Sequence, residues 1–219
     1  MLKKNIIWAA AVAAVAFAVY LSTACRTVYV GDSGELISAA LVLGIPHPPG
    51  YPLFCILGRL FTFAVPFGSV AFRVNILSSL LASGSTALLF LSVMKTVQYP
   101  AASHGPASAV AAACASLAFA FSSVFWSQAL IAKGCLYVLN IFLLSFVLYL
   151  LVSAERNPKP GFLYAAAFLY GLAAANHHTG FAVFPALFFF IFILPRRIWN
   201  RPSFWLKLSG LVVMGLALY

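Results

Sequence analysis

Apolar residues follow one another in long runs along this chain and do not alternate with polar residues. About 20 such residues cross roughly 30 Å of hydrocarbon as a helix, whereas barrel strands would alternate. Since only helices and closed barrels satisfy every backbone group in lipid, the pattern predicts an all-α, polytopic integral membrane protein with a single transmembrane domain. The expected spans cover about residues 5–24, 74–94, 107–125, 138–153, 162–175 and 180–194, with an incomplete one at 208–219.

Residues 25–72, which are rich in Gly and Pro, are expected to form an outer loop. The loop has two apolar pieces, 36–45 and 53–65, and each is short for a crossing. If 53–65 does not cross, nine of the 13 basic residues lie with the N-terminus on the cytoplasmic side; if it crosses, most of them move outside. We therefore predict that the two pieces form helices at the outer membrane surface. The basic residues on the cytoplasmic side are then Lys3, Lys4, Lys95, Arg156, Lys159, Arg196, Arg197, Arg201 and Lys207. We also expect the first span to remain uncleaved.

The apolar region 162–194 is too long for one crossing. Its 33 residues (194 − 162 + 1) would make a helix of about 50 Å at 1.5 Å per residue. The polar run 176–180 interrupts it. We therefore predict a tight turn there, near the outer surface, where polar groups must face protein or water.

Composition and charge narrow the class of protein. With 64% hydrophobic and 7% charged residues, a water-soluble fold is excluded, because soluble domains have about 25% charged residues. The net charge of +10 suits basic flanks facing anionic lipid, and no nucleic-acid-binding motif accompanies it, so nucleic acid is not an expected partner. The four cysteines lack metal-ligand spacing and are expected to pack; a disulfide among Cys25, Cys55 and Cys135 stays open.

The predicted topology gathers three polar segments on the outer side, 31–52, 126–137 and 176–179. The first contains Asp32 and Glu35, two of the three acids of the chain. A carboxylate at a membrane surface is costly unless it is paired, hydrated or functional. For Asp32, capping of the following helix and catalysis are equally supported, whereas capping is favoured for Glu35.

Histidines and basic residues in the outer segments suggest an anion site. His177 and His178 are adjacent on a turn and cannot easily bind one metal ion together. They form either a polar turn or, in our preferred interpretation, donors to an anionic headgroup, a role that His47 could share. The cations Lys133, Arg59 and Arg73 could neutralise the same anion, although each alone is commonly a snorkelling side chain.

The motifs GDSGEL (31–36) and HPPGYP (47–52), with FWSQA (125–129) and NHHT (176–179), resemble the membrane family related to protein O-mannosyltransferases. The similarity covers nearly all of the chain, and the first two motifs together are specific. It implies a GT-C-like helical bundle in a multi-pass membrane protein, with a bacterial inner membrane as the expected location.

The resemblance also implies an inverting glycosyltransferase. Such an enzyme moves a mannose-like sugar from a polyprenyl-phosphate carrier to an acceptor hydroxyl, on protein Ser/Thr or a glycan, at the outer face. Asp32 would be the general base, with Glu35 as a second catalytic carboxylate. The sequence requires no cofactor, and assistance by a divalent metal stays open but unsupported. The expected substrate-binding residues are His47, Tyr51, Arg73, Gln128, Tyr137, Asn176, His177 and His178.

The chain departs from the family pattern in two ways. The family has an acid before the Tyr that follows Trp-Ser-Gln, whereas this chain has Lys133-Gly134-Cys135-Leu136-Tyr137. It also stops within an apolar run, so we expect an N-terminal fragment or a truncated paralogue.

Two other functions remain as alternatives. A transporter or flippase of lipid-linked sugar would need polar residues at the bilayer midplane and inverted repeats, which the sequence does not show. A non-catalytic membrane scaffold would instead bind the lipid-linked sugar or partners without turnover.

Overall fold

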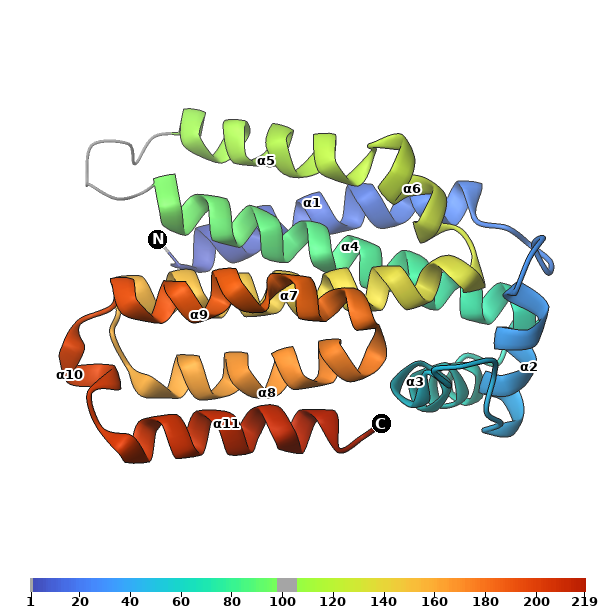
Figure 1. The fold of residues 1–219 in the computed structure, drawn as a ribbon. Helices are drawn as coiled ribbons and strands as arrows, with labels where there is room; N and C mark the ends of the chain where they lie inside the picture. Colours follow the sequence, from blue (N-terminus) through green and yellow to red (C-terminus); the bar gives the residue numbers. More distant parts are fainter. Residues whose placement is uncertain (1, 98–105) are drawn as a thin grey trace.

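The computed structural model describes residues 2–97 and 106–219, and these residues form helices and no strand. The all-α class predicted from the sequence is therefore confirmed. Most of the helices run side by side in a bundle (Figure 1). The helices α2 (Ser33–Val42) and α3 (Pro52–Ala64), which follow the first span, lie across one end of that bundle.

Three helices are long and apolar enough to cross a membrane: α1 (Leu2–Thr23), α4 (Val70–Val97) and α7 (Ala132–Arg156). A fourth crossing is available if α5 (Pro106–Ala120) and α6 (Ser123–Ala129) count as one span bent by 69°. The bend lies within the span predicted at 107–125, and α6 lies at the same end of the bundle as α2.

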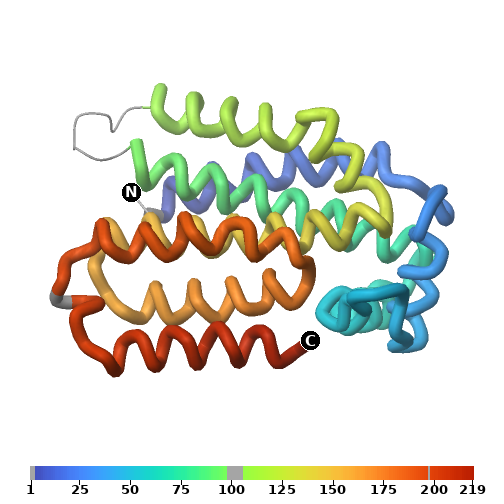
Figure 2. The backbone as a smooth tube through the Cα atoms, viewed as in Figure 1, coloured from blue at the N-terminus to red at the C-terminus, as the bar shows by residue number. Residues whose placement is uncertain are grey.

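The C-terminal part of the chain forms shorter helices. After α8 (Pro160–Asn176) the chain reverses through the 3-10 helix η1 (His178–Val183) and returns as α9 (Phe184–Ile193), as the tube in Figure 2 shows. The predicted turn lies at this reversal. A short α10 (Arg196–Trp199) then leads into α11 (Pro202–Leu216). None of these described helices exceeds 17 residues, so the crossings predicted for this part stay predictions.

Helices α8 and α11 approach each other backbone to backbone at two glycines. A Cβ on Gly171 would lie 2.3 Å from the carbonyl oxygen of Val212, and a Cβ on Gly215 would lie 2.5 Å from that of Phe168. Contacts this short leave no room for any side chain. Small residues permit the same close packing at membrane helix interfaces in general.

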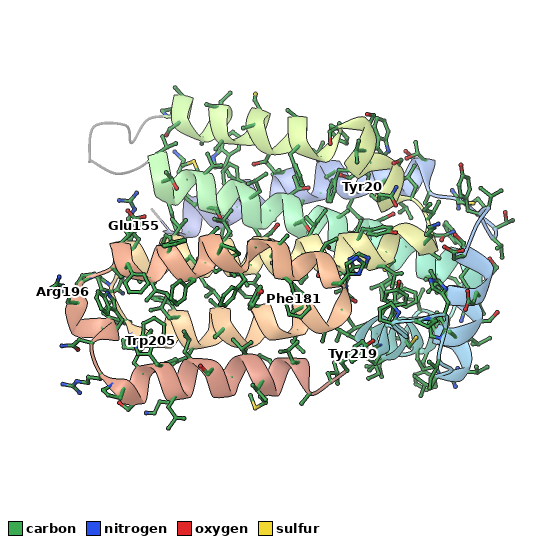
Figure 3. All side chains as sticks on the ribbon, viewed as in Figure 1. Tyr20, Glu155, Phe181, Arg196, Trp205 and Tyr219 are labelled. Carbon is green, nitrogen blue, oxygen red and sulfur yellow. The ribbon has the colours of Figure 1, made fainter. Side chains whose placement is uncertain are left out.

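The two ends of the bundle differ in chemistry. The last turns of α4 and α7, with Lys95 and Arg156, and the α9–α11 connection form one end. Figure 3 shows Glu155 and Arg196 at this end, far from α3. The polar segments around α2, α6 and η1 gather at the opposite end. The arrangement agrees with the charge sorting predicted from the sequence.

Side chains of α4 hold the broken helices at that polar end. The hydroxyls of Ser78 and Ser79 donate to the last carbonyls of α6, at 3.0 Å for Gln128 and 2.9 Å for Ala129. The Asn75 amide donates to two carbonyls in the segment after α1, at 2.7 and 3.2 Å. Helix ends otherwise leave carbonyls without partners, so these contacts fix where α6 stops and α7 starts.

All four cysteines are free thiols in the structure. The alternative of a disulfide among Cys25, Cys55 and Cys135 is therefore wrong.

The glycine contact between α8 and α11 predicts that Gly→Ala substitutions at two positions of α11 change the free energy of unfolding by different amounts. Gly215→Ala should lower the free energy of unfolding by about 1–3 kcal/mol, because the added methyl overpacks the contact. Gly210→Ala is the matched control, since no atom lies within 4 Å of its Cβ position and alanine favours the helix. Thermal unfolding in detergent micelles measures both, and equal stability of the two variants would contradict the packing.

Candidate functional site

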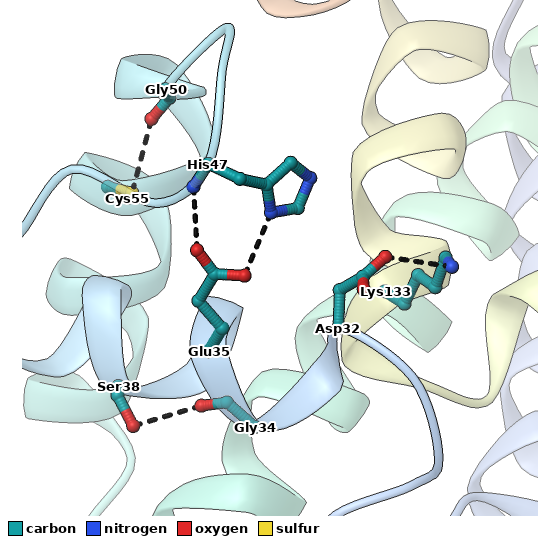
Figure 4. Close-up of polar contacts among 8 residues, drawn as sticks. All are labelled: Asp32, Gly34, Glu35, Ser38, His47, Gly50, Cys55 and Lys133. Carbon is teal, nitrogen blue, oxygen red and sulfur yellow. Dashed lines mark hydrogen bonds and ion pairs between the residues drawn. The ribbon is translucent and has the colours of Figure 1, made fainter.

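Asp32 forms an ion pair with Lys133 at the polar end of the bundle. The Nζ atom of Lys133 lies 2.8 Å from Oδ2 of Asp32, and the two side chains are 38% and 43% exposed. Asp32 occupies the N-cap position of α2, but its side chain makes no capping hydrogen bond. The carboxylate therefore reaches across to α7 instead of capping its own helix, and it stays accessible from outside (Figure 4).

Glu35, in the first turn of α2, holds the loop between α2 and α3. One carboxylate oxygen accepts the backbone N–H of His47 at 2.6 Å, and the other contacts Nδ1 of the same residue at 2.8 Å. Both contacts appear in Figure 4, where the imidazole points toward the side of Asp32. Because both oxygens are engaged with His47, the structure favours positioning of this loop as the role of Glu35.

Rings from three elements come together beside these carboxylates. The ring centroid of His177 lies 6.4 Å from that of Tyr51, nearly parallel to it, and 5.2 Å from that of Tyr137. Tyr51 also contacts His47 edge-on at 5.6 Å, and His178 stacks on His177 at 4.4 Å. Predicted site residues from the segment 25–72, α7 and the η1 turn are thus brought together.

Tyr51 adopts a left-handed backbone conformation, with φ 47° and ψ 53°, as the residue before α3. This conformation costs about 1–2 kcal/mol for a residue with a Cβ. The ring is buried between His47 and His177, and these contacts help to offset that cost.

Helix α7 begins before the span predicted at 138–153. It starts at Ala132, so Lys133 and Tyr137 lie in its first turns. Their i, i+4 spacing places both side chains on one face. The polar residues lowered the hydropathy there without ending the helix. Gly134 allows the turn, because a Cβ at that position would lie 2.0 Å from the carbonyl oxygen of Gln128.

A groove of about 810 Å³ opens beside the ion pair. Lys133, Tyr137 and Gln128 give it a polar wall, and the loop before Asp32 contributes Tyr29 and Gly31. Apart from Ser122, the rest of the lining is apolar: Val30, Phe119, Val124, Phe125, Ile131 and Ile141. The groove therefore offers a cation and hydrogen-bonding groups next to an apolar surface.

Three predicted site residues have other contacts. The Arg73 guanidinium donates to three backbone carbonyls around the α3–α4 connection, at 2.9 to 3.1 Å. Asn176 is fully buried, and its amide donates to the carbonyl of Leu136 at 3.0 Å, which anchors α8 to α7. Gln128 lines the groove, and its amide contacts the Ser127 hydroxyl at 3.4 Å. No hydrogen bond or ion pair of the described residues joins Arg73 to Asp32 or His177.

Most cations of the polar end are already engaged. Arg26 lies over the Phe72 ring at 4.5 Å, Arg73 is held by carbonyls, and Lys133 pairs with Asp32. Lys133 alone among these three lines the groove. It is therefore the cation placed to meet an anionic ligand.

These contacts change the protonation of the site. The hydrogen bond from Lys133, followed by its charge, lowers the pKa of the Asp32 carboxyl below its usual 3.8. Hydrogen bonds from His47 lower the pKa of Glu35 below 4.5. Burial lowers the pKa of His177 below 6.5, and the neighbouring His178 lowers it further. Near neutral pH the site therefore has two ionised carboxylates and an uncharged His177.

Within residues 2–97 and 106–219, no three His, Cys, Asp or Glu side chains are grouped closely enough to hold a metal ion.

Sequence comparison adds known relatives to this geometry. Residues 32–200 match the family model described as the protein O-mannosyl-transferase TMEM260 N-terminal domain. The chain is 37% identical over 166 residues to protein O-mannosyl-transferase TMEM260 of Mus musculus, which covers 74% of this chain and 22% of that protein. It is 30% identical over 201 residues to protein O-mannosyl-transferase tmem260 of Dictyostelium discoideum, covering 83% of this chain and 23% of that protein. No solved structure matches the chain.

The ion pair predicts how Asp32 titrates, and this can be read without assignment because Asp32 is the one aspartate in the sequence. Cell-free synthesis with carboxyl-13C aspartate gives a single resonance whose titration midpoint should lie below 3.8. Lys133→Met should raise the midpoint toward 3.8, since the hydrogen bond that favours the ionised form is gone. The ion pair's contribution to stability is full above pH 3.8 and is lost as the pH falls through the folded-state pKa.

Lys207→Met, at an exposed position of α11, is the control and should leave the midpoint unchanged. Identical midpoints for the wild type and Lys133→Met would show that the pair does not form.

Proposed function

The chain belongs to the protein O-mannosyl-transferase TMEM260 N-terminal domain family, and from that premise we propose that it forms the sugar-transfer site of a membrane mannosyltransferase. The donor is a mannose-like sugar on a polyprenyl phosphate, and the acceptor is a Ser or Thr hydroxyl of a protein. The observation that supports this most directly is the Asp32 carboxylate, ionised and 43% exposed at the edge of a groove that contains Lys133.

Asp32 is the general base of the proposed reaction. It removes the proton from the acceptor hydroxyl as that oxygen attacks the anomeric carbon of the sugar. The bond between this carbon and the phosphate oxygen breaks, and its electron pair leaves on the phosphate. Attack from the side opposite the phosphate inverts the anomeric carbon. The lowered pKa of Asp32 keeps the base ionised at neutral pH.

The groove suits a lipid-linked phosphate better than a free sugar nucleotide. Lys133 and the Gln128 amide supply charge and a hydrogen-bond donor for a phosphate. The apolar side chains Phe119, Val124 and Ile141 offer a surface for the first isoprene units. A phosphate placed there would share Lys133 with Asp32, and so bring the leaving group close to the base.

Lys133 occupies the segment in which the resembled family has an acid. The positive charge replaces a second carboxylate and can stabilise the phosphate as it gains charge on leaving. One carboxylate, Asp32, then acts as base. Glu35 orders the His47 loop.

We place the polar end of the bundle on the non-cytoplasmic face. The basic helix ends lie at the other end of the bundle, and the positive-inside rule assigns that end to the cytoplasm. The helices α2 and α3 then lie at the outer surface, where the exposed side chains of Phe63 in α3 and Ile45 in the connecting loop are available to contact lipid. The location in a bacterial inner membrane stays a prediction.

Asp32→Asn tests the base directly. In membranes that contain the protein at wild-type level, transfer of labelled mannose from a polyprenyl-phosphate donor should fall by about 10²–10⁴-fold, because the amide cannot accept the proton. Glu155→Gln is the matched control and should retain wild-type transfer, since Glu155 lies at the far end of α7. Retained transfer by Asp32→Asn would remove Asp32 from its role. Donor binding without turnover by the wild type would favour the scaffold alternative.

Cysteine labelling tests the proposed orientation. In a cysteine-free background, Val30→Cys and His178→Cys should react with an impermeant thiol reagent from the outer side. Lys207→Cys should react only after the membrane is permeabilised. If Val30→Cys and His178→Cys label from opposite sides, the proposed site cannot form.

A further inference from the structure

His177 accepts two hydrogen bonds on the same ring nitrogen. The backbone N–H of Thr179 donates to Nδ1 at 3.3 Å, and the Thr179 hydroxyl lies 2.8 Å from the same atom. The ring is 7% exposed, and its own backbone is fixed as the N-cap of η1.

The backbone contact decides which nitrogen holds the proton. A backbone N–H can only donate, so Nδ1 must present a lone pair to it. A neutral imidazole with a bare Nδ1 has its proton on Nε2. The Thr179 hydroxyl then donates to Nδ1 as well. A proton on Nδ1 would instead face the Thr179 N–H and break that contact.

A buried amide in α7 continues this chain of donors. Nδ2 of Asn140 donates to Oγ1 of Thr179 at 3.4 Å, and Asn140 is 4% exposed. The hydroxyl accepts from Asn140 on one side and donates to His177 on the other. The two hydrogen bonds therefore run in one direction: Asn140 donates to Thr179, and Thr179 donates to His177.

The other ring nitrogen remains available. No hydrogen bond of the described residues uses Nε2 of His177, and Nε2 is not among the buried polar atoms without a partner. It lies on the ring edge away from Thr179, in a ring that packs between Tyr51 and Tyr137. Since Nε2 has no hydrogen bond among the described residues and is not one of those buried atoms, it keeps some accessible surface.

We propose that Thr179, supported by Asn140, is a positioning residue that holds the neutral His177 ring with its proton on Nε2, so that this N–H donates to a substrate oxygen. The identity of that oxygen, a donor phosphate or a sugar hydroxyl, rests on the proposed function; the tautomer does not. His177 thus acts as an uncharged hydrogen-bond donor, and Lys133 supplies the positive charge of the site. Burial, which disfavours the charged ring, acts in the same direction.

Nitrogen NMR measures the tautomer without any transfer assay. The sequence has four histidines, so 15N-histidine labelling gives few signals, and loss of one set in His177→Gln assigns the residue. Near neutral pH the wild type should show a bare Nδ1 and a protonated Nε2 for His177. A protonated Nδ1 as the main species would overturn the proposal, whether or not the protein transfers mannose.

Removal of the hydroxyl should change the ring itself. Thr179→Val keeps the size of the side chain but leaves Nδ1 with the longer backbone contact alone. The neutral ring loses a stabilising bond, so the pKa of His177 should rise toward its ordinary value of about 6.5. Transfer should fall about three- to tenfold, the usual range for one hydrogen bond. Thr179→Ser should restore both quantities.

Thr96→Val is the control for this substitution, because the Thr96 hydroxyl bonds only within α4, to Ser92 at 3.0 Å, at the opposite end of the bundle. Thr96→Val should change neither the pKa of His177 nor the rate of mannose transfer. A His177 titration that is the same in Thr179→Val and in the wild type would contradict the role of the hydroxyl.

Two substitutions of the histidine itself separate the ring nitrogens. The amide nitrogen of Gln lies as many bonds from Cα as Nε2, and that of Asn as many as Nδ1. His177→Gln should therefore retain more transfer than His177→Asn. The reverse order would mean that Nδ1 is the working atom. If the wild type transfers no mannose, the proposed function fails, while the NMR result still decides the tautomer.

Discussion

Within a bilayer, a helix that ends early must find partners for its last carbonyls in the protein, because hydrocarbon offers none. In this chain α4 supplies them: its serine hydroxyls and Asn75 satisfy the end of α6 and the segment after α1. The start of α7 depends on that anchoring. Since Lys133 stands in the first turn of α7, the Asp32 ion pair and the groove beside it depend on it too.

The site therefore assembles from segments that are distant in sequence but end at one level of the bundle. Asp32 and Glu35 enter with α2, Lys133 and Tyr137 with α7, and His177 with the α8–η1 turn. Asp32 pairs with Lys133 of α7, and Tyr137 contacts the His177 ring. Glu35 bonds to His47 in the loop after α2, and His177 obtains its nearest polar partner from its own turn. Such cross-pairing makes the geometry of the site a property of the whole bundle end.

The sequence predicted the helical class, the reversal after Asn176 and the gathering of polar segments, because hydropathy and charge act over whole segments. It did not predict the Asp32–Lys133 pair, since Lys133 lies outside the predicted spans and helix capping was an equally supported role for Asp32. The contacts of Arg73 with carbonyls were equally hidden, because a cation at a membrane surface has the same sequence signature whether it binds substrate or backbone. The Thr179 contact is local, and the two-residue spacing from His177 is the signal that could have revealed it.

The pairing of Asp32 with Lys133 has a consequence for what the groove attracts. Lys133 is the cation that lines the groove, and Asp32 neutralises its charge. Lys133 therefore attracts the anionic headgroups of bulk lipid only weakly. An anionic ligand must instead displace Asp32 from Lys133 or share Lys133 with it. Binding in the groove therefore depends more on shape and hydrogen bonding than on long-range electrostatic attraction.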